Sequence, residues 1–142
     1  MLDLHLLPKG VRNTSALYIS DVLEPLVVPF LDEHPDIIFQ QDNAPVHKSG
    51  KCRAYMEEQG IEVLPWPAKS PDLSIIENLW TILKRRVGNL PPSVKRQGLW
   101  DKVQEAWESM QLDHDEILQP LYDSIPKRLD AVIAAEGGST KY

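Results

Sequence analysis

The chain has 142 residues, a length typical of one domain, and its 42% hydrophobic and 25% charged residues are ordinary for a globular protein. It contains no run of about 18 apolar residues, which argues against a membrane-spanning helix, and its single cysteine, Cys52, excludes an internal disulfide and a multi-cysteine zinc site. A formal net charge of −6 argues against a uniformly basic DNA clamp.

The first third of the chain predicts a strand and then a helix. Residues 2–7 alternate apolar and polar side chains before a Pro-Lys-Gly turn, which predicts a strand. Residues 13–15 are Asn, Thr and Ser, whose side chains can cap the free amides of a helix that starts there. Pro25 and Pro29 should kink or end this helix, because proline lacks the backbone N–H that a helix interior uses.

The middle of the chain repeats this order. The apolar runs at 36–40 and 61–64 predict two buried strands. Between them a helix is expected to begin at Pro45, since proline suits the first helical position, and to stop at Gly60. Ser74 then precedes apolar residues at three-and-four spacing, which predicts another helix.

The last third predicts helices alone. Residues 99–112 are amphipathic, and residues 117–135 are predicted to be helical with a break near Pro126. Strands alternating with helices, followed by helices only, predict the α/β class, with a mixed sheet flanked by helices. The sheet-bearing core is expected over residues 1–88, and residues 89–142 are expected to form a helical extension of the same domain.

Charge is distributed unevenly over the second half of the chain. Residues 81–102 contain six cations and one acid, whereas residues 104–123 contain six acids and no lysine or arginine. A basic segment of this kind can bind a polyanion even when the total charge is negative, which predicts phosphate contacts. The alternative is two solvated helix faces, which composition alone favours. The candidate DNA-binding residues are Lys84, Arg85, Arg86, Lys95 and Arg96.

Asp42 and Glu77 form the candidate catalytic pair. Asp42 follows the predicted strand 36–40, and Glu77 lies one turn into the helix that follows the next strand. The carboxyl ends of strands form the crevices of α/β sheets, so neighbouring strands would direct both carboxylates to one spot. Carboxylates are the ligands that Mg²⁺ prefers, and paired metal ions can activate the attacking oxygen and stabilise the leaving oxygen of a phosphoryl transfer.

Each candidate also has a purely structural explanation. Ser74 and Glu77 have the spacing of a capping box, and Asp42 followed by Asn43 favours a turn. His47 can lie near a metal or donate to a phosphate, but a lone histidine in the first turn of a helix is more often a local hydrogen-bonding residue.

Three linked motifs favour the catalytic explanation. They are QQDNAPVH at residues 40–47, WPAKSPDL at 66–73 and IENLW at 76–80, and together they resemble the catalytic domain of Tc/mariner-family transposases. The 34 residues from 43 to 76 separate Asp42 from Glu77, which resembles the family's spacing of the second and third catalytic acids. Glutamate in third place and the sequence of residues 124–142 resemble the Tc branch, so the likeness covers nearly the whole chain.

The resemblance implies a truncated ribonuclease-H-like fold and an Asp-Asp-Glu triad that holds two Mg²⁺ or Mn²⁺ ions. By this resemblance Asp42 and Glu77 are the second and third catalytic residues and metal ligands, and Asn43 and His47 are accessory residues. It further implies DNA as the partner. The complete protein would cleave DNA at transposon ends, join the freed 3′-hydroxyl to a TA target and act in the nucleus.

The chain departs from the family pattern in two places. Ser74 and Ile75 replace the family's Asn-Pro, and serine is an equally good cap. The family's first catalytic aspartate has no counterpart, because Asp3 falls on what resembles the third strand. We therefore expect little activity and weak or absent metal binding from this chain alone.

Absence of the family's first strand also bears on stability and function. It would leave strands 2–7 and 36–40 without a neighbour, so the chain is expected to be marginally stable, to form a homo-oligomer or to pair these two strands directly.

The sequence leaves two other functions open: a non-catalytic transposon-derived module that binds DNA or protein, and a remnant with no retained role.

Overall fold

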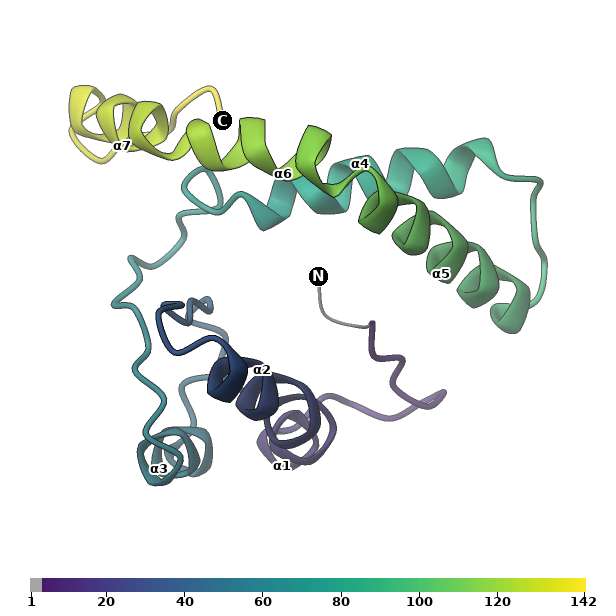
Figure 1. Cartoon of the computed structure of the whole chain (residues 1–142), viewed down its shortest axis with the longest axis horizontal. Helices are drawn as coiled ribbons and strands as arrows, with labels where there is room; N and C mark the ends of the chain where they lie inside the picture. Colours follow the sequence, from purple (N-terminus) through teal and green to yellow (C-terminus); the bar gives the residue numbers. More distant parts are fainter. Residues whose placement is uncertain (1–3) are drawn as a thin grey trace. The chain divides into compact units, whose positions relative to one another are not determined.

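The computed structural model describes residues 4–142, and the chain divides into two compact units, residues 1–69 and 70–142 (Figure 1). The division lies between Lys69 and Ser70, inside the second motif, WPAKSPDL at residues 66–73. The predicted subdivision into residues 1–88 and 89–142 stays a prediction. Among the described residues, no helix is both long enough and apolar enough to cross a membrane.

The first unit begins with a continuous helical stretch of three parts, α1 (Ser15–Tyr18), the π-helix η1 (Ile19–Val27) and α2 (Val28–Glu33). Thr14 caps it as predicted, because its hydroxyl accepts a hydrogen bond from the Leu17 amide at 3.3 Å. Pro25 does not end the helix but lies inside η1. The wider turn of a π-helix accommodates a proline that would disrupt an α-helical hydrogen bond.

Helix α3 (Gly50–Glu58) begins later than predicted but ends where expected. Pro45 starts a separate turn, closed by the Lys48 amide donating to the Ala44 carbonyl at 3.0 Å, and Ser49 then caps α3 through the Cys52 amide. At the other end Gly60 has a φ of +68°, which glycine adopts without strain. The Gly60 and Ile61 amides donate to the carbonyls of the last turn, the pattern of a Schellman cap.

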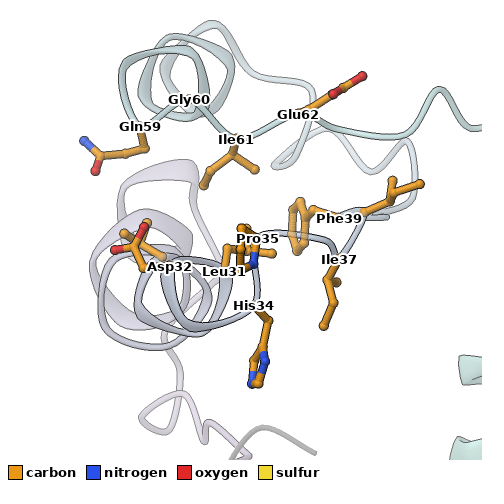
Figure 2. A pocket seen from close by; sticks show the side chains of 12 residues that line it. Leu31, Asp32, His34, Pro35, Ile37, Phe39, Gln59, Gly60, Ile61 and Glu62 are labelled. Carbon is orange, nitrogen blue, oxygen red and sulfur yellow. The ribbon is translucent and has the colours of Figure 1, made fainter.

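The core of the first unit lies between the first helical stretch and α3. Its buried side chains come from both, and partly buried residues such as Phe39, Ile61 and Val63 pack against them. The buried members are Tyr18, Leu23, Val27, Cys52 and Met56. An open hollow of about 350 Å³ lies beside this core, and Figure 2 shows Leu31, Phe39 and Ile61 among the residues that line it.

The predicted mixed sheet, and with it the predicted α/β class, is wrong for residues 4–142, which are helical. The one element of strand pairing in these residues is an isolated parallel bridge between Phe39 and Val63, in which the Leu64 amide donates to the Phe39 carbonyl at 2.9 Å. Residues 4–7 form no strand and no bridge to 36–40, and residues 2 and 3, including Asp3, lie outside the described residues. The prediction of strands at 36–40 and 61–64 is wrong, because a strand needs a neighbour along its whole length and these segments pair at a single point.

The second unit consists of α4 (Ile76–Asn89), α5 (Arg96–Leu112), α6 (His114–Asp123) and α7 (Ile125–Ala134). The predicted break near Pro126 is confirmed, because Pro126 occupies the start of α7, where proline is tolerated. The helices α4 and α5 pack together through Leu79, Leu83, Trp107 and neighbouring buried residues. The Trp80 and Trp107 rings are stacked, with centroids 6.0 Å apart.

Candidate active-site residues

Asp42 lies in a short loop that follows the Phe39–Val63 bridge, and its side chain is 68% exposed. Two donors reach the same carboxylate oxygen. The Ala44 amide donates to Oδ1 at 3.0 Å, and Nδ1 of His47 lies 2.7 Å from it. The turn that the sequence suggested as an alternative role for Asp42 is therefore formed, and it uses Oδ1 alone.

These contacts favour the ionised form of Asp42. The Ala44 amide is the main cause that lowers the pKa of this carboxyl below its usual value, and His47 adds to it through its hydrogen bond and its charge. The partial burial of the side chain acts in the opposite direction but is outweighed. Asp42 is therefore an anion at neutral pH, the state that a metal ligand requires.

His47 is held on two sides. Besides its contact with Asp42, its ring packs against the ring of Tyr18, with centroids 4.5 Å apart. The Tyr18 hydroxyl donates to Oε1 of Gln41 at 3.0 Å, and burial, with smaller effects of Cys52 and Asp42, raises the pKa of Tyr18 to about 12. The histidine thus sits between Asp42 and a neutral, anchored phenol.

Asn43 performs a structural role next to Asp42. Its Nδ2 donates to the Trp66 carbonyl at 2.8 Å, which ties the Asp42 loop to the loop after the bridge. This contact connects two of the three motifs, QQDNAPVH and WPAKSPDL, within the first unit. The structure therefore gives Asn43 a role in positioning the loop that carries Asp42.

Glu77 lies in the first turn of α4, in the second unit, and is exposed. The predicted capping box does not form, because the helix begins after Ile75 and has no side-chain cap. The Ser74 carbonyl, rather than its hydroxyl, accepts the Glu77 amide at 3.2 Å. Within the described residues, no side chain or amide pairs with the Glu77 carboxylate, so the local explanation offered for this residue is not supported.

A buried arginine that sequence reasoning did not single out fixes the start of α4. Arg128 of α7 is 3% exposed, and its guanidinium donates to the Asp72 carbonyl at 2.7 Å and to Oδ1 of Asn78 at 2.8 Å. It also donates to the Ser124 hydroxyl and lies 4.7 Å from the ring centre of Tyr142. Asp72 and Asn78 flank Glu77, so the C-terminal helix holds the turn that carries it. The contact spans 50 to 56 residues of sequence, which explains why no local pattern indicated it.

The candidate DNA-binding cations differ in their surroundings. Lys84, Arg85, Lys95 and Arg96 are exposed. Arg86 instead donates to the Ser109 hydroxyl at 2.7 Å and pairs with Asp113 at 2.8 Å, so it joins α4 to the end of α5. The contacts of Arg86 are those of a structural residue.

The donor chemistry of the two acids fits a divalent cation, but the described residues do not assemble a complete site. Asp42 and Glu77 each expose a carboxylate, the type of ligand that Mg²⁺ and Mn²⁺ prefer. No group of three His, Cys, Asp or Glu side chains able to hold a metal ion occurs in residues 4–142.

Comparison with known proteins agrees with the motifs. A family model described as DDE superfamily endonuclease matches residues 10–100. Among curated proteins, the chain is 38% identical over 105 residues to the Transposable element Tc1 transposase of Caenorhabditis elegans, covering 74% of this chain and 37% of that protein. It is 34% identical over 137 residues to the Tcb1 transposase of Caenorhabditis briggsae, covering 94% and 49%, and 41% identical over 112 residues to the Tc3 transposase of C. elegans, covering 75% and 32%. The chain thus spans less than half the length of these relatives.

Solved structures show the same relationship at the level of the fold. The Mos1 transposase catalytic domain, in a structure with Raltegravir and Mn, matches with a TM-score of 0.75 and 22% identity over 96% of this chain and 70% of that one. A second structure of that domain, with Raltegravir and Mg, matches with a TM-score of 0.72 and 22% identity over 93% and 67%. The two structures of the Mos1 domain are thus complexes with a divalent metal, Mn in one and Mg in the other. This chain belongs to the DDE superfamily endonucleases and is part of the DDE domain of a Tc1/mariner-family transposase.

Proposed function

We propose that this chain supplies part of the catalytic domain of a transposase, with Asp42 and Glu77 as two of its carboxylate ligands for Mg²⁺ or Mn²⁺. The complete protein would cleave DNA at transposon ends and transfer the freed strand to a TA target. Action on chromosomal DNA would place that protein in the nucleus.

The observation that carries this proposal is that the two acids of the family motifs are exposed and keep carboxylate oxygens available. Asp42 uses one oxygen for its own turn, and Glu77 uses neither for a cap. Acids with purely structural roles of the kind weighed above would be expected to spend these oxygens on backbone amides. The spacing between the two acids resembles that of the family, and each lies in a motif within the residues that the family model matches.

Bound metal ions would activate the attacking oxygen and stabilise the leaving oxygen of the phosphodiester. The chain's own residues have simpler tasks. Asp42, held as an anion by the Ala44 amide and His47, would provide a fixed negative ligand. Glu77 would provide a second one from a turn that Arg128 holds in place through Asp72 and Asn78.

For DNA contact we propose the exposed cations Lys84, Arg85, Lys95 and Arg96, without Arg86. Their charges would neutralise phosphates and release counterions, so affinity should fall steeply as salt rises. Replacing Lys84 and Arg85 with alanine should weaken DNA binding and reduce the steepness of its salt dependence. Binding that ignores ionic strength, or that both substitutions leave unchanged, would refute this part of the proposal.

A chimaera tests the catalytic proposal. Residues 10–100 of this chain would replace the matching segment of the Tc1 transposase, and cleavage of transposon-end DNA would be measured with Mn²⁺. The chimaera should cleave, and Asp42→Asn or Glu77→Gln should each reduce cleavage by about a thousandfold or more, since metal-based charge stabilisation supplies much of the rate.

Matched controls separate catalysis from charge and folding. Asp36→Asn in the first unit removes an exposed acid that belongs to none of the three motifs, and cleavage should stay within about twofold. Cleavage that survives Asp42→Asn or Glu77→Gln would contradict the roles assigned to these acids. A folded chimaera in which Asp36→Asn is as damaging as Asp42→Asn would contradict them as well.

A further inference from the structure

We propose that His47 is a positioning residue for Asp42: it donates its Nδ1 proton to Oδ1 and thereby reserves Oδ2 as the single oxygen of Asp42 that binds a metal ion. This inference rests on the proposed function for the role of Asp42. It assigns His47 neither to the metal nor to a phosphate.

The first step is the asymmetry of the Asp42 carboxylate. Both donors in the described part of the chain, the Ala44 amide and His47 Nδ1, reach Oδ1, at 3.0 and 2.7 Å, and none reaches Oδ2. Two donors on one oxygen restrict the rotation of the carboxylate about its bonds. The side chain as a whole is 68% exposed, so Oδ2 remains accessible.

The second step concerns the proton on His47. An anionic carboxylate oxygen only accepts hydrogen bonds, so the short contact requires a proton on Nδ1. The contact with Oδ1 occupies Nδ1, and a nitrogen that donates a proton in this way cannot also ligate a metal.

The third step is the support behind the ring. His47 lies in the turn closed by the Lys48 amide and the Ala44 carbonyl, and its ring packs on Tyr18, which is 9% exposed. Tyr18 is held in turn by Gln41, whose Nε2 contacts the Met56 sulfur at 3.6 Å. Tyr18, behind the His47 ring, and Gln41, which precedes Asp42, are thus both tied to the core of the first unit. Such a partner behind a metal ligand orients it, and its loss typically lowers metal affinity by about 10- to 100-fold.

Two substitutions of His47 test the inference in the metal-free chain. In His47→Asn the amide nitrogen takes the place of Nδ1, whereas in His47→Gln it lies nearer the place of Nε2. Nitrogen NMR of the wild-type chain should show His47 with its proton on Nδ1. Three-bond couplings should show one dominant χ1 rotamer of Asp42 in wild type and in His47→Asn, and averaging among rotamers in His47→Gln.

Mn²⁺ supplies the second measurement on the same chain, through the line broadening of the Ala44 amide signal. Because binding by this chain alone is expected to be weak, broadening should occur in wild type at high Mn²⁺ concentration, and it should disappear in Asp42→Asn. The apparent Kd for Mn²⁺ should rise about tenfold in His47→Gln and stay within about twofold in His47→Asn.

The two measurements separate the inference from the function on which it rests. If wild type shows no broadening that depends on Asp42, the proposed metal role of Asp42 fails, and with it the claim that Oδ2 is a ligand. If broadening depends on Asp42 but His47→Gln matches His47→Asn in both rotamer and Kd, the positioning role is refuted while the proposed function stands. A His47 ring that carries a proton on Nε2 and none on Nδ1 would also refute it.

Discussion

Arg128 should contribute more to the stability of the second unit than any exposed residue of that unit. Its guanidinium makes three hydrogen bonds of 2.7 to 2.9 Å, to the Asp72 carbonyl, Oδ1 of Asn78 and the Ser124 hydroxyl. We expect Arg128→Met to lower the free energy of unfolding of this unit by about 3 kcal/mol. Methionine keeps most of the apolar stem, so the loss reports the hydrogen bonds rather than a cavity.

The magnitude follows from opposing terms. Three hydrogen bonds from a charged donor are worth about 1.5–3 kcal/mol each, and the contact with the Tyr142 ring adds about 0.5–1 kcal/mol. Burial of the guanidinium costs several kcal/mol, because all three acceptors are neutral and the side chain is 3% exposed. The difference leaves a net contribution of about 2–4 kcal/mol.

Urea unfolding followed by tryptophan fluorescence measures this contribution. Trp80, Trp100 and Trp107 lie in the second unit and only Trp66 in the first, so the signal reports mainly the second unit. The urea midpoint should fall without a change in slope, since the exposed surface on unfolding is similar.

Two control variants make the result specific. Arg128→Lys keeps the charge but cannot reach three acceptors with a planar fork, so it should recover half of the loss at most. Arg85→Met removes an exposed arginine from α4 and should change the free energy by less than about 0.5 kcal/mol. The hydrogen bonds from Arg128 to Asp72 and Asn78 do not stabilise the second unit if Arg128→Met is as stable as Arg85→Met. The same conclusion follows if Arg128→Lys is as stable as wild type.

Three further predictions concern a phenol, an ion pair and a glycine. Burial raises the pKa of Tyr18 from 10.0 to about 12, so the neutral phenol stabilises the fold fully at pH values below 10. This contribution to stability is lost as the pH rises from 10 to about 12. Absorbance of the phenolate should show a late titration phase that Tyr18→Phe removes. Arg86→Met should lower the urea midpoint by the equivalent of about 1–2 kcal/mol through its lost contacts with Ser109 and Asp113, with little further loss when Asp113→Asn is added. Gly60→Ala should cost about 1–2 kcal/mol and Gly60→Asn less, both read from thermal unfolding, because the φ of +68° and not a clash opposes a side chain there.

Helix boundaries were predictable where one residue determines them. The hydroxyl of Thr14 caps α1 and the positive φ of Gly60 ends α3, and both effects act over fewer than five residues. Pro25 was expected to kink or end the helix, and it does not end it, because the chain adopts a π-helix around it. A local pattern shows that a helix is interrupted but not how the chain continues.

That the described residues form no sheet was not predictable from the same kind of information. The apolar runs at 36–40 and 61–64 have the composition of strands, and their contact at Phe39 and Val63 is parallel. Strand pairing, however, depends on two segments at once and not on the composition of one. These two segments are separated in sequence by α3 and pair only at Phe39 and Val63 in the described residues. The same limitation hid Arg128, whose partners are 50 or more residues away in sequence.

Asp42 shows why a structural explanation and a functional one need not compete. The sequence suggested either a turn residue or a metal ligand, and the structure forms the turn. A carboxylate has two oxygens, and the turn and His47 together use only Oδ1. The contacts that would ordinarily explain Asp42 away instead hold it as an oriented anion with Oδ2 accessible, which is what a metal ligand must be before the ion arrives. For Glu77 the structural alternative fails outright, because Ile75 occupies the cap position of α4 and no side chain of the described residues caps the helix. The catalytic explanation therefore gains support from opposite outcomes at the two acids.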